Sequence, residues 1–260
     1  MAIMQQPVRQ QSADDLKVRV YRTRGEMGAA AGADVAARIK GLLATKRTIR
    51  MVFAAAPSQN ETLDALAADP DIDWSRITAF HMDEYLGLPA GAPQAFGRYL
   101  QGRLFDKVKP GTVHLIDSTG DSNAECRRYA ALLGAEPIDI VCLGIGENGH
   151  IAFNDPPVAD FADPQLIKPV ELDEACRRQQ VNDGCFSSLD AVPTHALTLT
   201  VPALLAGAHL FCGVPGPTKR QAVARTLSEP VATACPSTIL RRHPDCTLYV
   251  DLDAFGEAGR

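Results

Sequence analysis

Apolar runs typical of buried strands alternate with helical segments along most of the chain. Ile49 to Ala55 and Ile138 to Leu143 are two such runs, and the Ala-rich segment 25–45 places Ile39 and Leu43 on one helical face. Strands that alternate with helices pair in parallel, because each helix carries the chain back to the start of the next strand. This alternation predicts an α/β fold: an open, mostly parallel sheet with helices on both faces.

The predicted elements run from residue 18 to residue 250. Strands are expected at residues 18–21, 49–55, 77–82, 113–116, 138–143, 197–201, 210–214 and 246–250. Helices are expected at residues 25–45, 60–68, 96–108, 122–133 and 218–228. Residues 156–169 contain prolines, which discourage helix, and are expected to be irregular. Because no linker-like stretch divides the pattern, we expect a flexible polar N-terminus over residues 1–16 and a single domain over residues 17–260.

The charge of the chain limits its partners. Lys and Arg number 26 against 31 Asp and Glu, which gives a formal net charge of −5. An acidic chain without a basic stripe is poorly suited to nucleic acid or to an anionic membrane surface. No stretch approaches the ~20 apolar residues of a membrane span. We therefore expect neither nucleic acid nor a membrane as a partner.

The cysteines and the N-terminal residues indicate a cytoplasmic protein. The seven cysteines are scattered, odd in number and include no Cys-x-x-Cys pair, which argues against a disulfide framework or a structural zinc site. Met1 to Asp15 is polar and lacks the apolar core of a secretory signal. A reducing compartment fits both observations.

The segment from Asp139 to Asp155 carries the strongest signal of a functional site. The predicted strand stops at Gly144, and two further glycines follow among polar residues. Ligands bind beyond the carboxyl ends of strands in open α/β sheets, and glycine allows close approach of backbone to a ligand. A tight turn with an incidental histidine is the alternative. We expect a pocket mouth formed by Glu147, Asn148, His150 and Asp155.

A second block, His81 to Pro89, reads His-Met-Asp-Glu-Tyr-Leu-Gly-Leu-Pro and precedes Pro93 to Phe96 at the start of a predicted helix. The two blocks, in this order, resemble the signature of glucosamine-6-phosphate deaminases, also called isomerases. The resemblance extends loosely from Val18 to Asp251. It implies a Rossmann-like fold and an aldose–ketose isomerase that converts glucosamine 6-phosphate and water to fructose 6-phosphate and ammonia, without a cofactor or metal.

The resemblance also implies the catalytic roles. His150 matches the ring-opening histidine, and imidazole suits this step because its unperturbed pKa of about 6.5 allows proton transfer in both directions near neutral pH. Asp83 matches the base that moves a proton between C2 and C1. Asp155 matches a position that is usually Glu in the family and that fixes the histidine tautomer. Asn148 matches a position that is Asp in some members, and since an amide cannot take a proton we expect it to orient its neighbours.

The resemblance implies a phosphorylated amino sugar as the substrate. Lys219 matches the phosphate-binding lysine of the family. The phosphate loop departs from the family's Gly-Gly-Thr-Pro type, because Ala54 to Thr62 reads Ala-Ala-Ala-Pro-Ser-Gln-Asn-Glu-Thr, with Ser58 in place of the threonine. Helix capping without a ligand is the alternative for this loop, and Gln59 is expected to be structural. Further substrate contacts are expected from Glu84, Gly146 and Gly149.

The lid and the assembly state are less defined. The family's lid supplies an arginine to the phosphate, and Arg177 and Arg178 lie in the comparable segment. A homo-oligomer is possible, since relatives range from monomers to hexamers.

Three alternative functions compete with this one. The altered loop favours an isomerase of a different sugar phosphate as one alternative. A non-catalytic sugar-phosphate sensor on the same fold is another, since fold does not fix function, although a sensor needs neither the candidate base nor the candidate acid. A lactonase of the phosphogluconolactone type shares the general fold, but Asn154 to Pro156 and the block from Met82 to Pro89 argue against it. A metal site at His81, Asp83 and Glu84 is disfavoured, because adjacent strand residues point to opposite faces.

Overall fold

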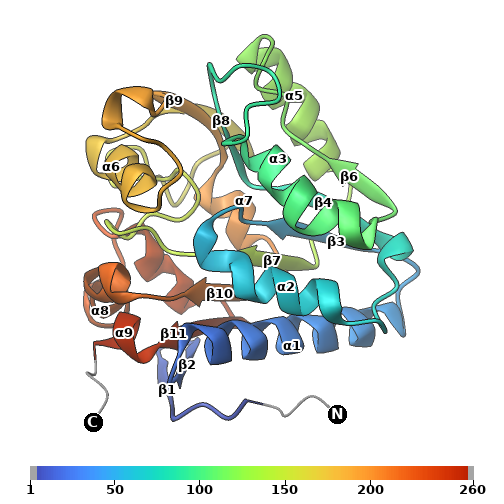
Figure 1. Ribbon diagram of the computed structural model, residues 1–260, viewed down its shortest axis with the longest axis vertical. Helices are drawn as coiled ribbons and strands as arrows, with labels where there is room; N and C mark the ends of the chain where they lie inside the picture. Colours follow the sequence, from blue (N-terminus) through green and yellow to red (C-terminus); the bar gives the residue numbers. More distant parts are fainter. Residues whose placement is uncertain (1–4, 257–260) are drawn as a thin grey trace.

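An eight-stranded sheet forms the centre of the computed structural model, which describes residues 5–256 (Figure 1). Its strand order is β1-β2-β11-β10-β7-β3-β4-β6, and every neighbouring pair except β1–β2 is parallel. The strands are β1 (Arg9–Ala13), β2 (Leu16–Tyr21), β3 (Ile49–Phe53), β4 (Ile77–His81), β6 (Thr112–His114), β7 (Ile140–Leu143), β10 (His209–Val214) and β11 (Cys246–Asp251). The predicted α/β fold with a mostly parallel sheet is confirmed.

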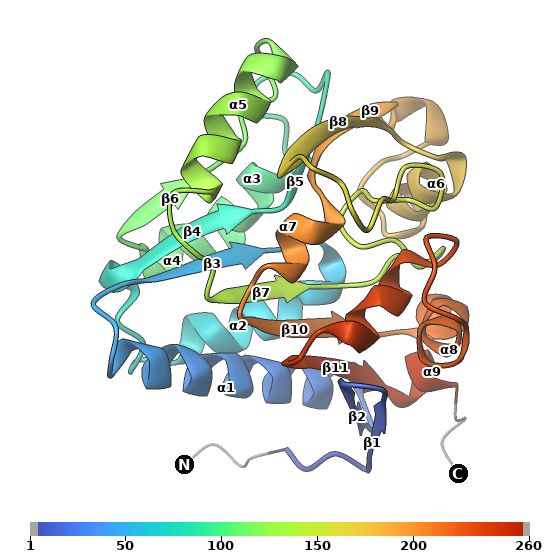
Figure 2. The same cartoon turned by 180° about the vertical axis from the view of Figure 1, so that it is seen from behind.

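Helices cover both faces of this sheet (Figures 1 and 2). The helices are α1 (Arg24–Leu43), α2 (Asn60–Ala68), α3 (Phe96–Leu100), α4 (Asp106–Val108), α5 (Ser122–Leu133), α6 (Glu174–Asn182), α7 (Val201–Leu205), α8 (Arg220–Ser228) and α9 (Leu252–Phe255). Short 3-10 turns at Pro57–Gln59 and Pro217–Lys219 lead directly into α2 and α8. No helix within residues 5–256 has both the length and the apolar character needed to cross a bilayer.

The side chains of β3 pack into apolar clusters on both faces of the sheet. All five of its residues are buried. Met51 and Phe53 pack with apolar residues of α1 and α2, whereas Val52 packs with those of α5 and α7. Because successive strand side chains point to opposite faces, a strand covered on both faces needs a continuous apolar run. The run at Ile49–Phe53 meets that requirement.

A small second sheet extends the fold beyond the predicted alternation. It consists of β5 (Asp83–Tyr85), β9 (His195–Leu199) and β8 (Ile167–Glu171), in that order and antiparallel. The strand predicted at residues 197–201 is therefore part of a separate sheet. The irregular segment predicted at residues 156–169 ends earlier, because β8 begins at Ile167. Pro169 is compatible with β8 because an edge strand leaves one row of N–H groups unpaired.

The N-terminal segment also differs from its prediction. Residues 9–13 form β1, which pairs antiparallel with β2, where a flexible polar segment was predicted over residues 1–16. Polar residues suit this strand because it lies at the edge of the sheet, where its side chains are largely exposed. Residues 1–4 of that prediction lie outside the described residues.

Candidate active site

A pocket lies beyond the carboxyl ends of β3, β7 and β10. β3 and β7 are neighbours, but the chain continues from β3 to β4 and β6 on one side and from β7 to β10 and β11 on the other. Such a reversal of strand order opens a crevice in which α/β proteins bind ligands. Five of the predicted site residues line this pocket: Ser58, Asp83, Gly146, His150 and Lys219.

His150 is held by two polar neighbours in the loop after β7. Its Nδ1 lies 2.9 Å from Asp155 Oδ1 and 2.8 Å from Asn148 Oδ1. Asn148 Nδ2 donates to the same Asp155 oxygen at 2.8 Å, and the backbone N–H of His150 donates to Asn148 Oδ1 at 3.0 Å. A proton on Nδ1 satisfies both acceptors, which leaves Nε2 free to accept a proton.

Asp155 stays ionised in this arrangement although it is fully buried. Burial alone raises the pKa of a carboxyl group. The charge and hydrogen bond of His150, and to a smaller degree the hydrogen bonds of Asn148 and Cys176, more than offset that effect, so the pKa of Asp155 is lowered. An ionised carboxylate beside Nδ1 fixes the imidazole tautomer and stabilises the imidazolium form.

Two glycines shape the loop around His150 in different ways. The imidazole packs directly on Gly146, where an added Cβ would overlap the ring. Gly149 has a φ of 90°, a conformation that favours glycine, and an added Cβ would lie 2.6 Å from Cys235 Sγ. Gly149 is not among the residues that line the pocket, so the structure does not bring it to the expected substrate contact. Its carbonyl instead accepts a hydrogen bond from Ser237 N at 2.8 Å.

Gly146→Ala is expected to lower kcat about 100-fold, because the new methyl group displaces the imidazole and misplacement of about 1 Å can cost that much. Steady-state kinetics together with the melting temperature measure the effect. Gly41→Ala is the matched control, since Gly41 lies in α1 with nothing within 4 Å of an added Cβ. Activity of Gly146→Ala within twofold of wild type contradicts the placement of His150.

Asp83 approaches the pocket from a different strand end. It follows β4 after one residue and begins β5, and its side chain lines the pocket although it is almost fully buried. Burial raises the pKa of Asp83 well above its usual value, and the neighbouring Glu84 adds to this shift. A carboxylate with a raised pKa is a better proton acceptor from carbon.

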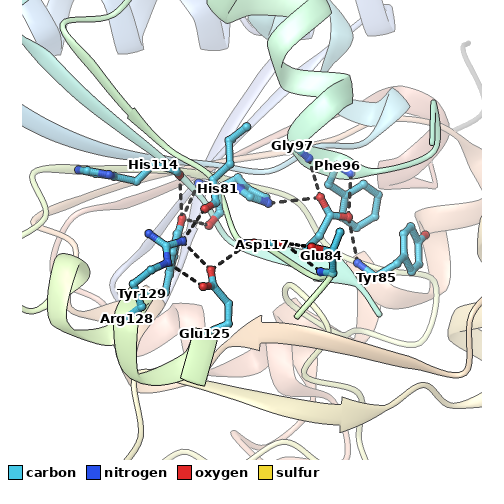
Figure 3. A network of polar contacts seen from close by, with 12 residues as sticks. His81, Glu84, Tyr85, Phe96, Gly97, His114, Asp117, Glu125, Arg128 and Tyr129 are labelled. Atoms are coloured by element: carbon cyan, nitrogen blue, oxygen red, sulfur yellow. Dashed lines mark hydrogen bonds and ion pairs between the residues drawn. The ribbon is translucent and has the colours of Figure 1, made fainter. Parts of the chain in front are cut away.

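Glu84 does not line the pocket, and its carboxylate is instead bound by backbone N–H groups (Figure 3). Its carboxylate accepts hydrogen bonds from the backbone N–H groups of Tyr85 and Phe96 at 3.0 Å and of Gly97 at 2.9 Å. His81 Nε2 lies 3.6 Å from the same group. The predicted substrate contact of Glu84 is therefore not seen: adjacent strand residues point to opposite faces, so Asp83 lines the pocket while Glu84 ties β5 to the start of α3.

Asp83→Asn is expected to raise the free energy of unfolding at neutral pH by about 1–3 kcal/mol, because it removes a buried carboxylate charge. The pKa of Asp83 is higher in the folded state than the ordinary 3.8, so the folded protein binds the proton more tightly. The contribution of Asp83 to wild-type stability should therefore be greatest below about pH 3.8. It should fall as the pH rises through the pKa of Asp83 in the folded state, so wild type loses stability relative to the variant.

Urea unfolding of wild type and variant between about pH 4 and about pH 8 measures this difference. Asp190→Asn serves as the control, because Asp190 is exposed and lies outside the pocket lining. A variant that is less stable than wild type throughout this range contradicts the prediction.

Lys219 supplies a positive charge to the pocket. It ends the turn before α8, its side chain is buried, and its Nζ has no hydrogen-bond partner among residues 5–256. Burial lowers the pKa of Lys219, while Asp183 and Glu147 act against this shift. A buried ammonium without a partner is costly, and a bound anion relieves that cost.

Ser58 lies in the loop after β3 and also lines the pocket. Its Oγ accepts a hydrogen bond from Gln59 Nε2 at 3.1 Å. The same amide donates to Gly213 O of β10 at 3.0 Å, so Gln59 joins the loop after β3 to β10. Pro57 removes one N–H from this turn, which leaves fewer backbone donors than in a glycine-rich loop.

The two arginines of the predicted lid segment do not line the pocket. Arg177 Nη2 donates to the carbonyls of Leu189 and Val192, and Arg178 pairs with Glu174 on the exposed side of α6. Both guanidinium groups are thus engaged elsewhere.

Other residues of the α6 segment occupy the pocket instead, and the sequence analysis missed them: Gln179, Gln180 and Asp183. Gln179 Oε1 accepts from Glu147 N at 2.7 Å, and Gln180 Oε1 accepts from Tyr85 OH at 2.7 Å. The spacing of i and i+4 between Gln179 and Asp183, on one face of a helix and its C-terminal end, is the signal that could have found two of them.

Within residues 5–256, one cluster has the side chains to hold a metal ion: His150, Asp155 and Cys176. Their potential ligand atoms all lie within 4.8 Å of one another. The alternative set of His81, Asp83 and Glu84 is not such a cluster, because Asp83 and Glu84 face different ways. His150 and Asp155 are already paired with each other at 2.9 Å, and a metal-free site stays a prediction.

An open parallel sheet with a carboxylate and a His–Asp pair at its strand ends defines an acid–base enzyme of the Rossmann-like class. Residues 22–249 match the sequence model of the family described as glucosamine-6-phosphate isomerases/6-phosphogluconolactonase. The chain belongs to this family. The glucosamine-6-phosphate deaminase of Bacillus thuringiensis (strain Al Hakam) is 36% identical over 185 residues, which cover 71% of this chain and 69% of the relative.

Solved structures agree with this assignment. A monomeric glucosamine-6-phosphate deaminase superposes with a TM-score of 0.84 at 29% identity, over 93% of this chain and 99% of the other. The 6-phosphogluconolactonase from Thermotoga maritima has a TM-score of 0.75 at 20% identity, over 91% of this chain and 99% of the other. At that identity the second similarity shows a shared fold alone.

Proposed function

We propose that this protein is a glucosamine-6-phosphate deaminase that converts glucosamine 6-phosphate and water to fructose 6-phosphate and ammonia. The observation that carries the proposal is that Asp83 and His150, from two different strand ends, line one pocket together with the unpaired ammonium of Lys219. The similarity to a deaminase at 36% identity supports the same reaction.

His150 opens the sugar ring in this proposal. Nε2 takes the proton of the C1 hydroxyl while the bond between C1 and the ring oxygen breaks, and the imidazolium then gives that proton to the ring oxygen. Asp155 stabilises the imidazolium during this exchange, since it lies 2.9 Å from Nδ1. The product is the open-chain aldehyde, with no net change in protons.

Asp83 then moves a proton from C2 to C1. As the C2–H electron pair forms the C1–C2 double bond, the π pair of the C1 carbonyl moves to its oxygen, which takes a proton from solvent and gives an enolamine. Asp83 then returns its proton to C1 while the nitrogen lone pair forms a C=N bond, which leaves an iminium group at C2; the proton taken from solvent is released when ammonia leaves. Water adds to C2, and the nitrogen leaves as ammonia to give the ketone. The raised pKa of Asp83 favours its part in both proton transfers.

A direct assay tests this function. The purified protein should release ammonia and fructose 6-phosphate in equal amounts from glucosamine 6-phosphate. A 6-phosphogluconolactone serves as the comparison substrate, because lactonases share the family and the fold. Lactone hydrolysis without ammonia release rejects the proposal in favour of a lactonase. Binding of the amino-sugar phosphate without turnover rejects it in favour of a sensor, and faster turnover of another sugar phosphate favours the alternative isomerase.

We further propose that the reaction needs no cofactor, because the side chains of the pocket supply the proton transfers. We also propose a cytoplasmic location, which fits the scattered cysteines of the chain. The assembly state stays a prediction: a homo-oligomer is possible, and the structural relative is described as monomeric.

A further inference from the structure

The inner face of α6 is largely polar, although a helix that packs on a protein normally buries apolar residues. Cys176, Gln179 and Gln180 are buried, and Asp183 at the C-terminal end of the helix is half-buried. Their positions follow the i, i+3, i+4, i+7 pattern of one helical face. The two glutamines and Asp183 line the pocket. Polar side chains that converge on a cavity indicate contact with a polar ligand.

A backbone donor fixes the orientation of the Gln179 amide. Glu147 N donates to Gln179 Oε1 at 2.7 Å. Because a backbone N–H can only donate, the oxygen of this amide faces Glu147 and its NH₂ group points away from Glu147. That group donates to Asp183 Oδ2 at 3.3 Å, and its second N–H has no acceptor within residues 5–256. Gln179 therefore has one N–H available to a ligand.

Asp183 offers free acceptor positions beside this donor. Apart from the long contact with Gln179, its carboxylate accepts no hydrogen bond and forms no ion pair in the part of the chain that the structure describes. A carboxylate has about four acceptor positions. A donor and an acceptor thus lie side by side in the pocket lining. A hydroxyl group fits both, because it donates and accepts, whereas an ammonium group only donates and a phosphate dianion only accepts.

We propose that Gln179 and Asp183 form a hydroxyl-binding pair, which makes the pocket specific for a polyhydroxylated carbon chain. Asp183 accepts the proton of a ligand hydroxyl, and Gln179 donates to the oxygen of a hydroxyl. The choice of sugar rests on the proposed function, in which C1 and C2 react and Lys219 holds the anion. The hydroxyls at C3, C4 and C5 are therefore the ones that the pair can select.

Unreactive ligands measure this selection directly. The ligands are the open-chain amino alditol 6-phosphate derived from glucosamine and its three forms that lack the hydroxyl at C3, C4 or C5. Isothermal titration calorimetry gives the Kd of each for the full-length wild type, Asp183→Asn and Gln179→Met. Every ligand carries the same phosphate, so a change of charge at residue 183 affects all of them alike. The ratio of Kd values between deoxy and parent ligand then isolates the hydroxyl.

Wild type should bind at least one deoxy form about tenfold more weakly than the parent, because a hydrogen bond to a carboxylate is lost. In Asp183→Asn this ratio should fall to about threefold or less, since a neutral acceptor binds the hydroxyl more weakly. Gln179→Met should reduce the ratio about threefold. Circular dichroism and the melting temperature check the folding of each variant.

Two variants outside the pocket control for the substitutions themselves. Asp190→Asn and Gln10→Met change exposed residues that do not line it, and both should keep the wild-type ratio. The inference is overturned if wild type binds every deoxy form within twofold of the parent, or if Asp183→Asn and Gln179→Met both keep the wild-type ratio. The second result assigns the selection to other residues.

Binding of these alditols needs no turnover, so the test does not depend on deamination. A protein that releases no ammonia but loses the preference in the two variants refutes the proposed function and supports the hydroxyl-binding pair. A protein that releases ammonia but binds all four alditols alike keeps the proposed function and overturns the pair.

Discussion

Asp83→Asn is expected to lower kcat about 1,000-fold while KM changes little. Asparagine keeps the shape of the side chain but cannot accept the C2 proton, and positioned general bases contribute about 10²–10⁴-fold. Coupled assay of fructose 6-phosphate measures the loss. Because burial raises the pKa of Asp83, wild-type activity should also rise with pH as this group loses its proton. The rising part of the pH–activity profile should therefore lie above pH 3.8, the ordinary pKa of an aspartate.

Deuterium exchange identifies the step that Asp83 performs. In heavy water that contains ammonium, wild type should exchange a C1 hydrogen of fructose 6-phosphate, because ammonia re-forms the imine at C2. Asp83→Asn should lose this exchange together with turnover. Asp190→Asn controls for the change of charge. An Asp83→Asn enzyme that retains more than about a tenth of wild-type kcat shows that another group is the base.

His150→Ala is expected to lower kcat for the cyclic substrate about 100- to 1,000-fold, because no other imidazole lines the pocket within residues 5–256 to shuttle the ring-opening proton. With ammonium present, the variant should still catalyse deuterium exchange into fructose 6-phosphate, since some ketose opens without help and Asp83 remains. Both rates are measured on the same preparation.

The pattern of the two rates separates the two roles. Loss of turnover with retained exchange assigns His150 to ring opening. Equal loss of both rates contradicts that assignment and places His150 in the C2–C1 proton transfer. Asp155→Asn should lower turnover less than His150→Ala, because the ring remains but its tautomer is no longer fixed.

The main sheet could be predicted because its strands are buried on both faces and leave continuous apolar runs. Ile49–Phe53 and Ile140–Leu143 fall inside the predicted runs at residues 49–55 and 138–143. The small sheet escaped prediction because β5 is three residues long and two of them are acidic. Such a segment looks like the end of β4, and only its pairing with β9, more than 100 residues later, makes it a strand.

The candidate site was partly predictable for a related reason. Asp83 and His150 follow apolar runs, so the rule of strand ends places both near a common crevice. Glu84 has the same local context as Asp83, and only the tertiary contacts with the start of α3 distinguish the two. The spacing of Gln179 and Asp183 puts both on one helical face, but only the packing of α6 over the pocket makes that face part of the lining.

A crystal structure with the open-chain amino alditol 6-phosphate tests most directly whether one pocket brings acid, base and ammonium to the same ligand. We expect the Asp83 carboxylate within hydrogen-bond or van der Waals contact of C1 and C2, His150 Nε2 at an oxygen of the chain, and Lys219 Nζ at the anion. A ligand bound elsewhere, or one that contacts His150 but leaves Asp83 behind packed side chains, contradicts the proposed enzyme.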